Sequence, residues 1–179
     1  TATTVALAVA LVGCSSEDGG DKKEDEAAVT IKSSLGTATI KGKPERIVTL
    51  GQGSAETAIA LGQTPVGIES YPWGSDKSGY LPWINEAVKK SGDKLPKQFA
   101  GGEEIDFEAI TELEPDVILD PWSGITQKQY DVLKDIAPTV AYPDQAWSTD
   151  WDQQMDIIGK ALGRTKDTDA LKKKIEKQL

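Results

Sequence analysis

The segment with the clearest chemical meaning is Gly51-Gln-Gly-Ser54, which follows a short apolar run and precedes an expected helix. Glycine-rich turns between a strand and a helix bring backbone N–H groups close to phosphates, as in dinucleotide-binding proteins. Here Glu56 replaces the third glycine of that motif, and Glu69 follows about a dozen residues on, where ~20 is usual. A carboxylate beside a pyrophosphate would repel it, so the segment predicts a ligand-binding turn more strongly than a nucleotide site.

Aromatic side chains gather where strands and helices are expected to end. Rings at the carboxyl ends of parallel strands can form a large apolar cleft with a polar rim, although any one of them could equally pack a loop. Trp83 and Trp151 stand at expected helix starts among polar neighbours and fit a packing role best. All five tryptophans and three of the four tyrosines belong to this group: Tyr71, Trp73, Tyr80, Trp83, Trp122, Tyr142, Trp147 and Trp151.

The sequence contains no histidine. This removes the commonest metal ligand, the Ser-His-Asp and Cys-His constellations, and the usual general base near neutral pH. Carboxylates such as Asp116 and Asp120 stand at the ends of expected elements, where solvated acids are ordinary, and acid–base catalysis would need a shielded group. We therefore predict no enzyme activity, no metal site and no intrinsic cofactor.

The charge balance is acidic, with 20 basic and 29 acidic residues and a formal net charge of −9. The one dense lysine cluster lies within residues 172–177. Nucleic-acid binding needs a basic face that displaces counterions, so we predict no nucleic-acid partner. The 38% of hydrophobic residues is enough for one good core.

The single cysteine ends an apolar run, Val5–Val12, in the sequence Leu11-Val-Gly-Cys14. The run is too short to span a bilayer, which takes ~20 residues, but it fits the core of a signal peptide. Leu-Val-Gly-Cys resembles a bacterial lipobox, in which the cysteine thiol receives a diacylglyceryl group. We expect residues 1–13 to be a signal-peptide remnant and Cys14 to be lipidated. A cysteine buried in a hydrophobic segment is less favoured, because the acidic stretch that follows is hard to bury.

Residues 14–28 continue from Cys14 as a polar stretch with six acidic and two basic residues. This composition predicts a disordered, solvated tether. Alternation over residues 29–40, with a turn at Gly36, then predicts a small hairpin.

Short apolar runs then alternate with helical patterns, which predicts a doubly wound parallel sheet covered by helices on both faces. Two further helices are expected after Asp150, the second with Leu171, Ile175 and Leu179 along one face. The expected strands are 46–50, 65–68, 116–119 and 139–142, and the helices are 55–61, 107–113, 126–137 with Thr126 as N-cap, and 151–162.

Several segments together resemble a known family, the class III substrate-binding lipoproteins of ABC importers for iron–siderophores and cobalamin. The resemblance covers residues ~29–179 with the expected order and spacing. The segments are Pro44-Glu-Arg-Ile-Val-Thr-Leu50, Thr64-Pro-Val-Gly67, the run from Phe107 to Ile118, Ile136-Ala-Pro-Thr-Val140 and Ile158-Gly-Lys-Ala-Leu-Gly-Arg164.

The resemblance implies one lobe of a two-lobed, periplasmic-binding-protein-like fold joined by a long helix. Residues 29–150 would form the N-terminal, ligand-binding lobe, and residues 151–179 would form helices leading into a truncated connecting helix, because the family is nearly twice as long. The implied protein is a monomer on the outer face of a Gram-positive cytoplasmic membrane, anchored through Cys14, and it delivers a ferric siderophore to ABC permease subunits.

The resemblance also implies site residues. Glu108 matches a glutamate that docks onto an arginine pocket of the permease; an ordinary acid at a helix start is the alternative. The family's ligand loops fall on Gln52, Gly53, Ser54, Tyr71, Trp73, Gly101, Gly102, Trp122, Ser123 and Trp147.

The missing histidine bears on the ligand as well. Importers of free Zn²⁺ or Mn²⁺ use histidine and carboxylate ligands, so we expect iron to arrive already held by its chelator. Trianionic catecholates need several basic residues, whereas the 71–80 segment offers only Lys77. A hydroxamate or carboxylate siderophore is favoured. Cobalamin or haem is the alternative within this fold, and a nucleotide-dependent α/β enzyme is less favoured.

Overall fold

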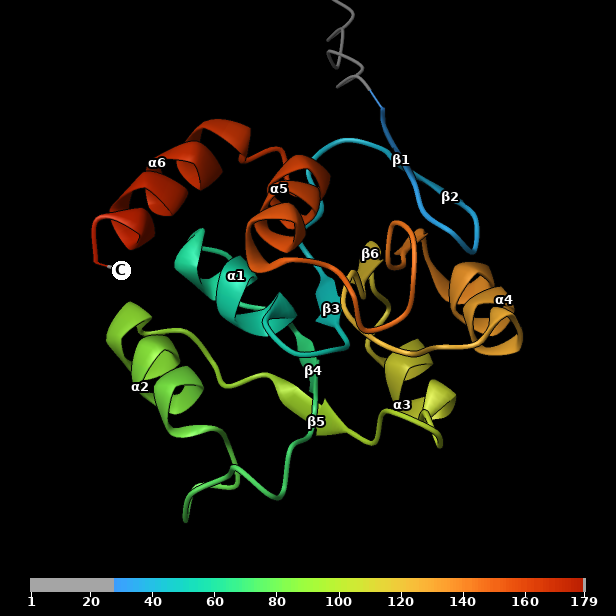
Figure 1. Cartoon of the computed structure of the whole chain (residues 1–179). Coiled ribbons are helices and arrows are strands. Elements are labelled where there is room, and N and C mark those ends of the chain that lie inside the picture. The colour runs from blue at the N-terminus through green and yellow to red at the C-terminus, as the bar shows by residue number, and fades with distance from the viewer. Residues whose placement is uncertain (1–27, 179) are drawn as a thin grey trace, which may run out of the picture.

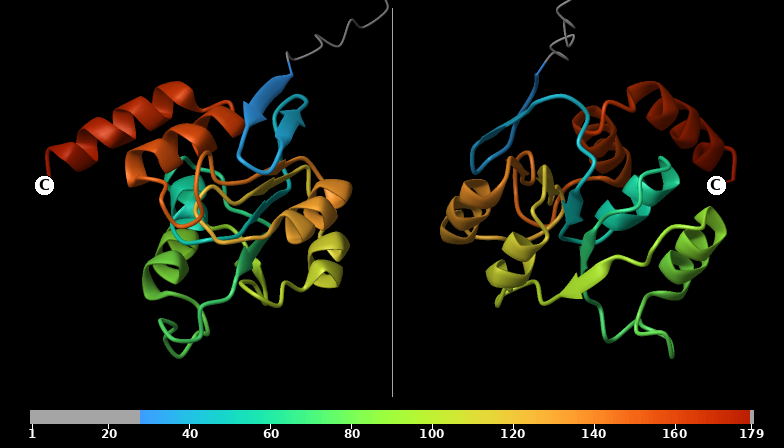
Figure 2. Two further views of the ribbon diagram at one scale, coloured as in Figure 1. Left: turned by 45° about the vertical axis from the view of Figure 1, so that its right-hand side comes forward. Right: turned by 180° about the vertical axis from the view of Figure 1, so that it is seen from behind.

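The computed structural model describes residues 28–178, so the predicted signal-peptide remnant, Cys14 and nearly all of the predicted tether lie outside the described residues. The first elements are β1 (Val29–Lys32) and β2 (Thr37–Ile40), which pair antiparallel. The hairpin expected over residues 29–40 is confirmed. It lies apart from the main sheet, beside β7 and α5, and contributes apolar side chains to the same core (Figure 2).

The main sheet has five strands, all parallel, in the order β5-β4-β3-β6-β7. Its strands are β3 (Ile47–Thr49), β4 (Gly67–Glu69), β5 (Lys97–Phe99), β6 (Val117–Leu119) and β7 (Thr139–Val140). Side chains alternate between two buried faces, which explains why the inner strands show no regular alternation of apolar and polar residues. Ile47 and Val117 join one core cluster, while Val48 and Ile118 join another, and all four are at most 1% exposed.

Helices cover both faces of this sheet, as expected (Figure 1). One face carries α1 (Ser54–Ala60), α2 (Pro82–Ser91) and α5 (Trp151–Ala161), and the other carries α3 (Phe107–Glu112) and α4 (Gln127–Ile136). The last helix, α6 (Thr165–Glu176), packs against α5. Within residues 28–178 we find no helix long and apolar enough to cross a membrane.

The strand order creates a switch point at the centre of the sheet. From β3 the chain moves outward through β4 and β5, and then it returns to the other side of β3 with β6 and β7. The connections after β3 and β6 therefore diverge to opposite faces, which leaves a crevice at the carboxyl ends of these neighbouring strands. In open α/β sheets such a crevice is the usual place for a ligand, whatever side chains surround it.

Strand β5 was not predicted from the sequence, and of α2 only a helix start near Trp83 was expected, without a range. Helix α2 begins at Pro82 amid aromatic residues and buries Ile84 and Val88. Strand β5 is an edge strand in which Phe99 alone is buried, so it lacks the apolar run of the inner strands.

Candidate functional site

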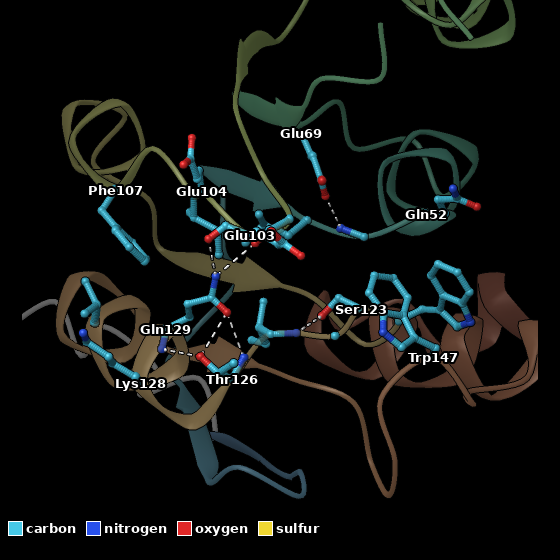
Figure 3. A pocket seen from close by; sticks show the side chains of 18 of the residues that line it. Gln52, Glu69, Glu103, Glu104, Phe107, Ser123, Thr126, Lys128, Gln129 and Trp147 are labelled. Carbon is cyan, nitrogen blue, oxygen red and sulfur yellow. Dashed lines mark hydrogen bonds between the residues drawn. The ribbon is translucent and has the colours of Figure 1, made fainter. Parts of the chain in front are cut away.

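A cavity of about 760 Å³ opens at the carboxyl ends of β3, β4 and β6 (Figure 3). Its lining mixes apolar and aromatic side chains with hydrogen-bonding groups, which is the usual make-up of a small-molecule site. The lining residues are Leu50, Gly51, Gln52, Glu69, Tyr71, Gly102, Glu103, Glu104, Ile105, Phe107, Trp122, Ser123, Gly124, Ile125, Thr126, Lys128, Gln129, Val132 and Trp147.

The turn after β3 requires its two glycines. Gly51 and Gly53 have φ angles of 72° and 83°, in the region that favours glycine. A Cβ atom on Gly51 would overlap the carbonyl oxygen of Trp122, and one on Gly53 would overlap the side chain of Gln154. Gln154 also donates a hydrogen bond of 2.7 Å from Nε2 to the carbonyl oxygen of Gln52, so α5 holds this turn in place.

Glu69 ends β4 and connects two loops of the site. Its Oε2 accepts a hydrogen bond of 2.8 Å from the Gly51 amide (Figure 3). It also accepts one of 3.0 Å from the Tyr71 hydroxyl. Burial, and then the neighbouring Glu69 carboxylate, raise the pKa of the Tyr71 phenol well above its usual value. The phenol therefore stays protonated and continues to donate to Glu69.

Asp120 follows β6 and is completely buried beneath the cavity. The hydroxyl of Ser123 donates a hydrogen bond of 2.6 Å to its Oδ2, while Oδ1 has no partner among the described residues. Burial raises the pKa of this carboxyl well above its usual range; the Ser123 hydrogen bond opposes the shift and the Glu69 charge adds to it. A neutral Asp120 carboxyl group that accepts one hydrogen bond, from Ser123, can support the Trp122–Ser123 turn.

Helix α4 forms the opposite wall and is fixed by a capping box. The side chain of Gln129 accepts a hydrogen bond of 2.9 Å from the backbone amide of Thr126. In return, the backbone amide of Gln129 donates a hydrogen bond of 3.3 Å to the Thr126 hydroxyl. The Nε2 group of Gln129 also donates to the carbonyl oxygens of Gly102 and Glu103 (Figure 3). The Gln129 side chain thus caps α4 and also holds the loop that carries the acidic lining residues Glu103 and Glu104.

Two tryptophans form an aromatic corner of the cavity. The rings of Trp122 and Trp147 meet edge to face, with centroids 4.9 Å apart and an interplanar angle of 74°. Trp147 has a φ angle of 62°, which is unusual for a bulky residue, and its side chain is 58% exposed. Its indole lies directly on Gly124, where a Cβ atom would overlap the ring. A large exposed ring is therefore held at the cavity by backbone geometry and close packing.

Six of the ten predicted ligand-binding residues line this cavity: Gln52, Tyr71, Gly102, Trp122, Ser123 and Trp147. The other four do not line it. Gly53 packs against Gln154, Ser54 is fully buried at the start of α1, and Gly101 lies against the Glu69 carboxyl group. Trp73 is 74% exposed and contacts the ring of Tyr71 edge-on at 5.8 Å. Ligand contact by any of the ten stays a prediction.

One of the aromatic assignments changes. Tyr142 does not face the crevice; it is buried, and its hydroxyl donates a hydrogen bond to the carbonyl oxygen of Ile125. Trp83 and Trp151, expected to have packing roles, do not line the cavity and are 53% and 43% exposed. The Trp83 indole donates to Glu56 at 2.9 Å, outside the cavity.

Several lining and supporting residues were not found from the sequence. Glu69 was noted only as a misplaced nucleotide-binding acid, although its position at a strand end was a usable signal. Gln129 was hidden within a helix, where its capping-box spacing from Thr126 was the available clue. Gln154 reaches the site from 102 residues away in sequence, so no local pattern could have indicated it.

The described residues contain no cluster of three or more histidine, cysteine, aspartate or glutamate side chains that could hold a metal ion. The chemistry offered by the cavity is recognition, through ring contacts, backbone groups and a few fixed hydrogen-bonding side chains. The predicted docking residue, Glu108, is exposed in the first turn of α3 and lies outside the cavity.

Comparison with curated proteins finds two relatives in Bacillus subtilis (strain 168). The chain is 32% identical over 169 residues to the putative ABC transporter substrate-binding lipoprotein YhfQ, a match covering 92% of this chain and 49% of YhfQ. It is 31% identical over 158 residues to the probable siderophore-binding lipoprotein YfiY, covering 86% and 45%. The chain thus spans about half the length of these relatives.

Comparison with solved structures also finds proteins that this chain matches over about half of their own length. PiaA of Streptococcus pneumoniae TIGR4 in complex with ferrichrome superimposes with a TM-score of 0.76 at 39% identity, over 82% of this chain and 48% of PiaA. Staphylococcus aureus SirA complexed with staphyloferrin B has a TM-score of 0.64 at 34% identity, over 81% and 46%. The sequence pattern of the family described as periplasmic binding protein matches residues 47–179, most of the described chain. On this match and this shared fold, the chain belongs to the periplasmic binding protein family.

Proposed function

We propose that this chain belongs to the extracytoplasmic substrate-binding component of an ABC importer, which captures a ferric siderophore and delivers it to the permease. The observation that carries the proposal is the cavity at the switch point of the sheet, with Trp122 and Trp147 at one corner. A ferric chelate is a compact ligand with much apolar surface, and aromatic walls with a few polar groups suit it. The iron stays within the chelator and is cargo, so the protein needs no metal ligands of its own.

The similarity to YhfQ and YfiY supports this role, since both are described as binding lipoproteins. Because the chain spans about half of each relative, we propose that residues 29–150 form one ligand-binding lobe. Residues 151–179 would lead into a helix that connects this lobe to a second one. In that arrangement the cavity described here is one half of the complete site.

We propose a ferric hydroxamate as the ligand. PiaA was solved with ferrichrome and shares 39% identity with this chain, against 34% for SirA with staphyloferrin B. The cavity lining contains one basic side chain, Lys128, among the described residues. The three negative charges of a trianionic catecholate complex would not be balanced by the single basic side chain of this cavity.

Tryptophan fluorescence of the full-length protein tests the ligand. Ferrichrome, ferric citrate and a ferric catecholate are titrated separately, and we expect submicromolar quenching by ferrichrome because Trp122 and Trp147 line the cavity. Replacing Trp122 with Phe should reduce the quenching amplitude, whereas Trp83→Phe, outside the cavity, should not. Quenching by the catecholate alone would refute the hydroxamate proposal. The absorption spectrum of the loaded protein would reveal a corrinoid or haem instead.

We also propose that the full-length protein is lipidated at Cys14 and held on the outer face of the cytoplasmic membrane. Its lipobox-like sequence supports this, together with relatives described as lipoproteins. A Cys14→Ala variant should appear in the culture medium, while the unaltered protein should stay with the membrane fraction. Equal release of both would contradict the anchor.

For Glu108 we propose docking onto the permease. Its exposed carboxylate at the start of α3 can form a charge-assisted pair with a guanidinium group. Glu108→Ala should lower iron uptake by cells at least fivefold while leaving ligand affinity unchanged. Glu86→Ala, an exposed acid on α2, serves as the matched control. Loss of ligand binding in Glu108→Ala would refute the docking role.

A further inference from the structure

The lining of the cavity is acidic. Glu69, Glu103 and Glu104 contribute three carboxylates, whereas Lys128 is the one basic side chain among the described lining residues. Glu103, Glu104 and Lys128 are exposed to solvent, which weakens their influence on a ligand. Glu69 is only partly exposed and lies at the floor, where its charge acts most strongly on a bound molecule.

The Glu69 carboxylate is held in one position by its surroundings. Its Oε2 accepts from the Gly51 amide at 2.8 Å and from the Tyr71 hydroxyl at 3.0 Å. The backbone of Gly101 lies so close that a Cβ atom there would overlap the carboxyl group. Its other oxygen, Oε1, accepts no hydrogen bond from the residues that the structure describes. Glu69 thus contributes a carboxylate held in one position to the lining of the cavity.

A second carboxyl group lies near Glu69, and it brings no compensating positive charge to this part of the cavity. Asp120 lies beneath the same floor, at the end of the strand two places from β4 in the sheet. The Gly51 amide and the Tyr71 hydroxyl are donors, but both are already bonded to Glu69. Both donors that contact Glu69 are therefore already engaged, so they are not available to an anionic ligand group, whereas a cationic group could pair with the carboxylate.

We infer that this cavity selects ferric chelates without net negative charge, and that Glu69 pairs with an ammonium or similar cationic donor carried by a trihydroxamate ligand. The inference rests on the proposed function and narrows its ligand class. A ferric trihydroxamate core is neutral, so one pendant amine makes the complex a monocation. Its ammonium group would pair with the Glu69 carboxylate while the apolar core contacts Trp122 and Trp147.

The test uses one ferric trihydroxamate scaffold in three forms, with its pendant amine free, acetylated or succinylated, so that the complex is cationic, neutral or anionic. Each is titrated into the full-length protein by tryptophan fluorescence. We expect Kd to rise about tenfold from the cationic to the neutral form and about tenfold again to the anionic form. Equal affinities, or tightest binding of the anionic form, would overturn the inference while leaving the proposed function intact. If none of the three binds, the hydroxamate proposal and this inference both fail.

The Glu69→Gln variant isolates the residue responsible. Glutamine keeps an acceptor oxygen for the Gly51 amide and Tyr71 but removes the charge, so the discrimination between cationic and neutral forms should fall to threefold or less. Glu86→Gln, which removes an exposed carboxylate on α2 outside the cavity, should keep the full discrimination. Unchanged discrimination in Glu69→Gln would overturn the role of Glu69. If that variant does not fold, the charge series on the unaltered protein still decides whether anionic chelates are rejected.

Discussion

Asp120 is the side chain whose ionisation depends most on its position. It is completely buried, it accepts one hydrogen bond from Ser123, and Glu69 lies near it. An ionised carboxylate in this place would lose its hydration without gaining a cation among the described residues. The residue is therefore a support for the Trp122–Ser123 turn in its neutral form and a source of instability in its charged form.

Asp120→Asn should change how stability depends on pH. Because the folded-state pKa of Asp120 is raised above 3.8, the folded protein binds more protons than the unfolded chain between about pH 4 and that raised value. The contribution of Asp120 to stability is thus largest at low pH and falls as pH rises through this window. Asn carries no charge, so Asp120→Asn should gain stability relative to the unaltered protein as pH rises from 5 to 8. Thermal unfolding at three pH values measures this, and parallel pH profiles would contradict it.

Gly124 controls the position of Trp147. A Cβ atom at Gly124 would overlap the indole, and that ring is half exposed, so it would swing toward solvent at little cost. Gly124→Ala should lower ligand affinity about tenfold, equivalent to ~1.4 kcal/mol, while changing the free energy of unfolding by less than ~1 kcal/mol. In a Trp147→Ala background the same substitution should have no further effect on affinity. An additive loss in the double variant would show that Gly124 acts by another route.

Among the elements, α5 fixes the ligand-binding turn after β3. Gln154 is buried in α5, lies against Gly53 and donates to the carbonyl oxygen of Gln52. Helix α5, which comes late in the chain, therefore positions a loop that comes much earlier in the sequence.

Gln154→Ala should loosen that turn. Loss of the hydrogen bond to Gln52 and of the packing on Gly53 should lower the free energy of unfolding by about 1–2 kcal/mol and weaken ligand binding several-fold. Gln153→Ala, at the neighbouring exposed position, is the matched control and should change neither. Urea unfolding and the fluorescence titration measure both quantities. If the two alanine variants behave alike, α5 does not position the turn.

At the scale of the whole molecule, the close packing of α5 on α6 determines how the last helix leaves the sheet. Gly159 lies within α5 directly against Thr168 of α6, where a Cβ atom would overlap the threonine hydroxyl group. Thr168 is buried, and its hydroxyl donates a hydrogen bond of 3.0 Å to the carbonyl oxygen of Arg164, so the hydroxyl cannot easily move. Lys172 and Asp156 join the same helices by an ion pair of 2.6 Å.

Gly159→Ala should destabilise the protein despite the higher helix propensity of alanine. Overpacking costs about 1–3 kcal/mol, against a gain of ~1 kcal/mol from propensity, so a net loss of roughly 1 kcal/mol is expected. Adding Thr168→Ala removes the hydroxyl and methyl groups that obstruct the new atom, so the double variant should lose less than the sum of the single losses. Strict additivity in thermal unfolding would argue against direct contact.

The sequence by itself determined the architecture and the edge of the sheet where the cavity lies. Runs such as Ile47–Leu50 and Val117–Leu119 show no alternation of apolar and polar residues because both faces of the sheet are buried, and that local signal does not depend on distant partners. The Thr126 cap of α4 was equally local. These patterns were enough to predict a doubly wound sheet with aromatic loops at its carboxyl edge.

Only the tertiary structure decided which residues share the cavity. Tyr142 and Trp122 both follow strands of one sheet, yet one is buried and the other lines the site, because register and neighbouring loops determine where each ring lies. Glu69 became a candidate for ligand recognition through its contacts with Gly51 and Gly101, which lie 18 and 32 residues away in sequence. Such contacts form between segments whose separation is fixed by packing, and no spacing along the chain encodes them.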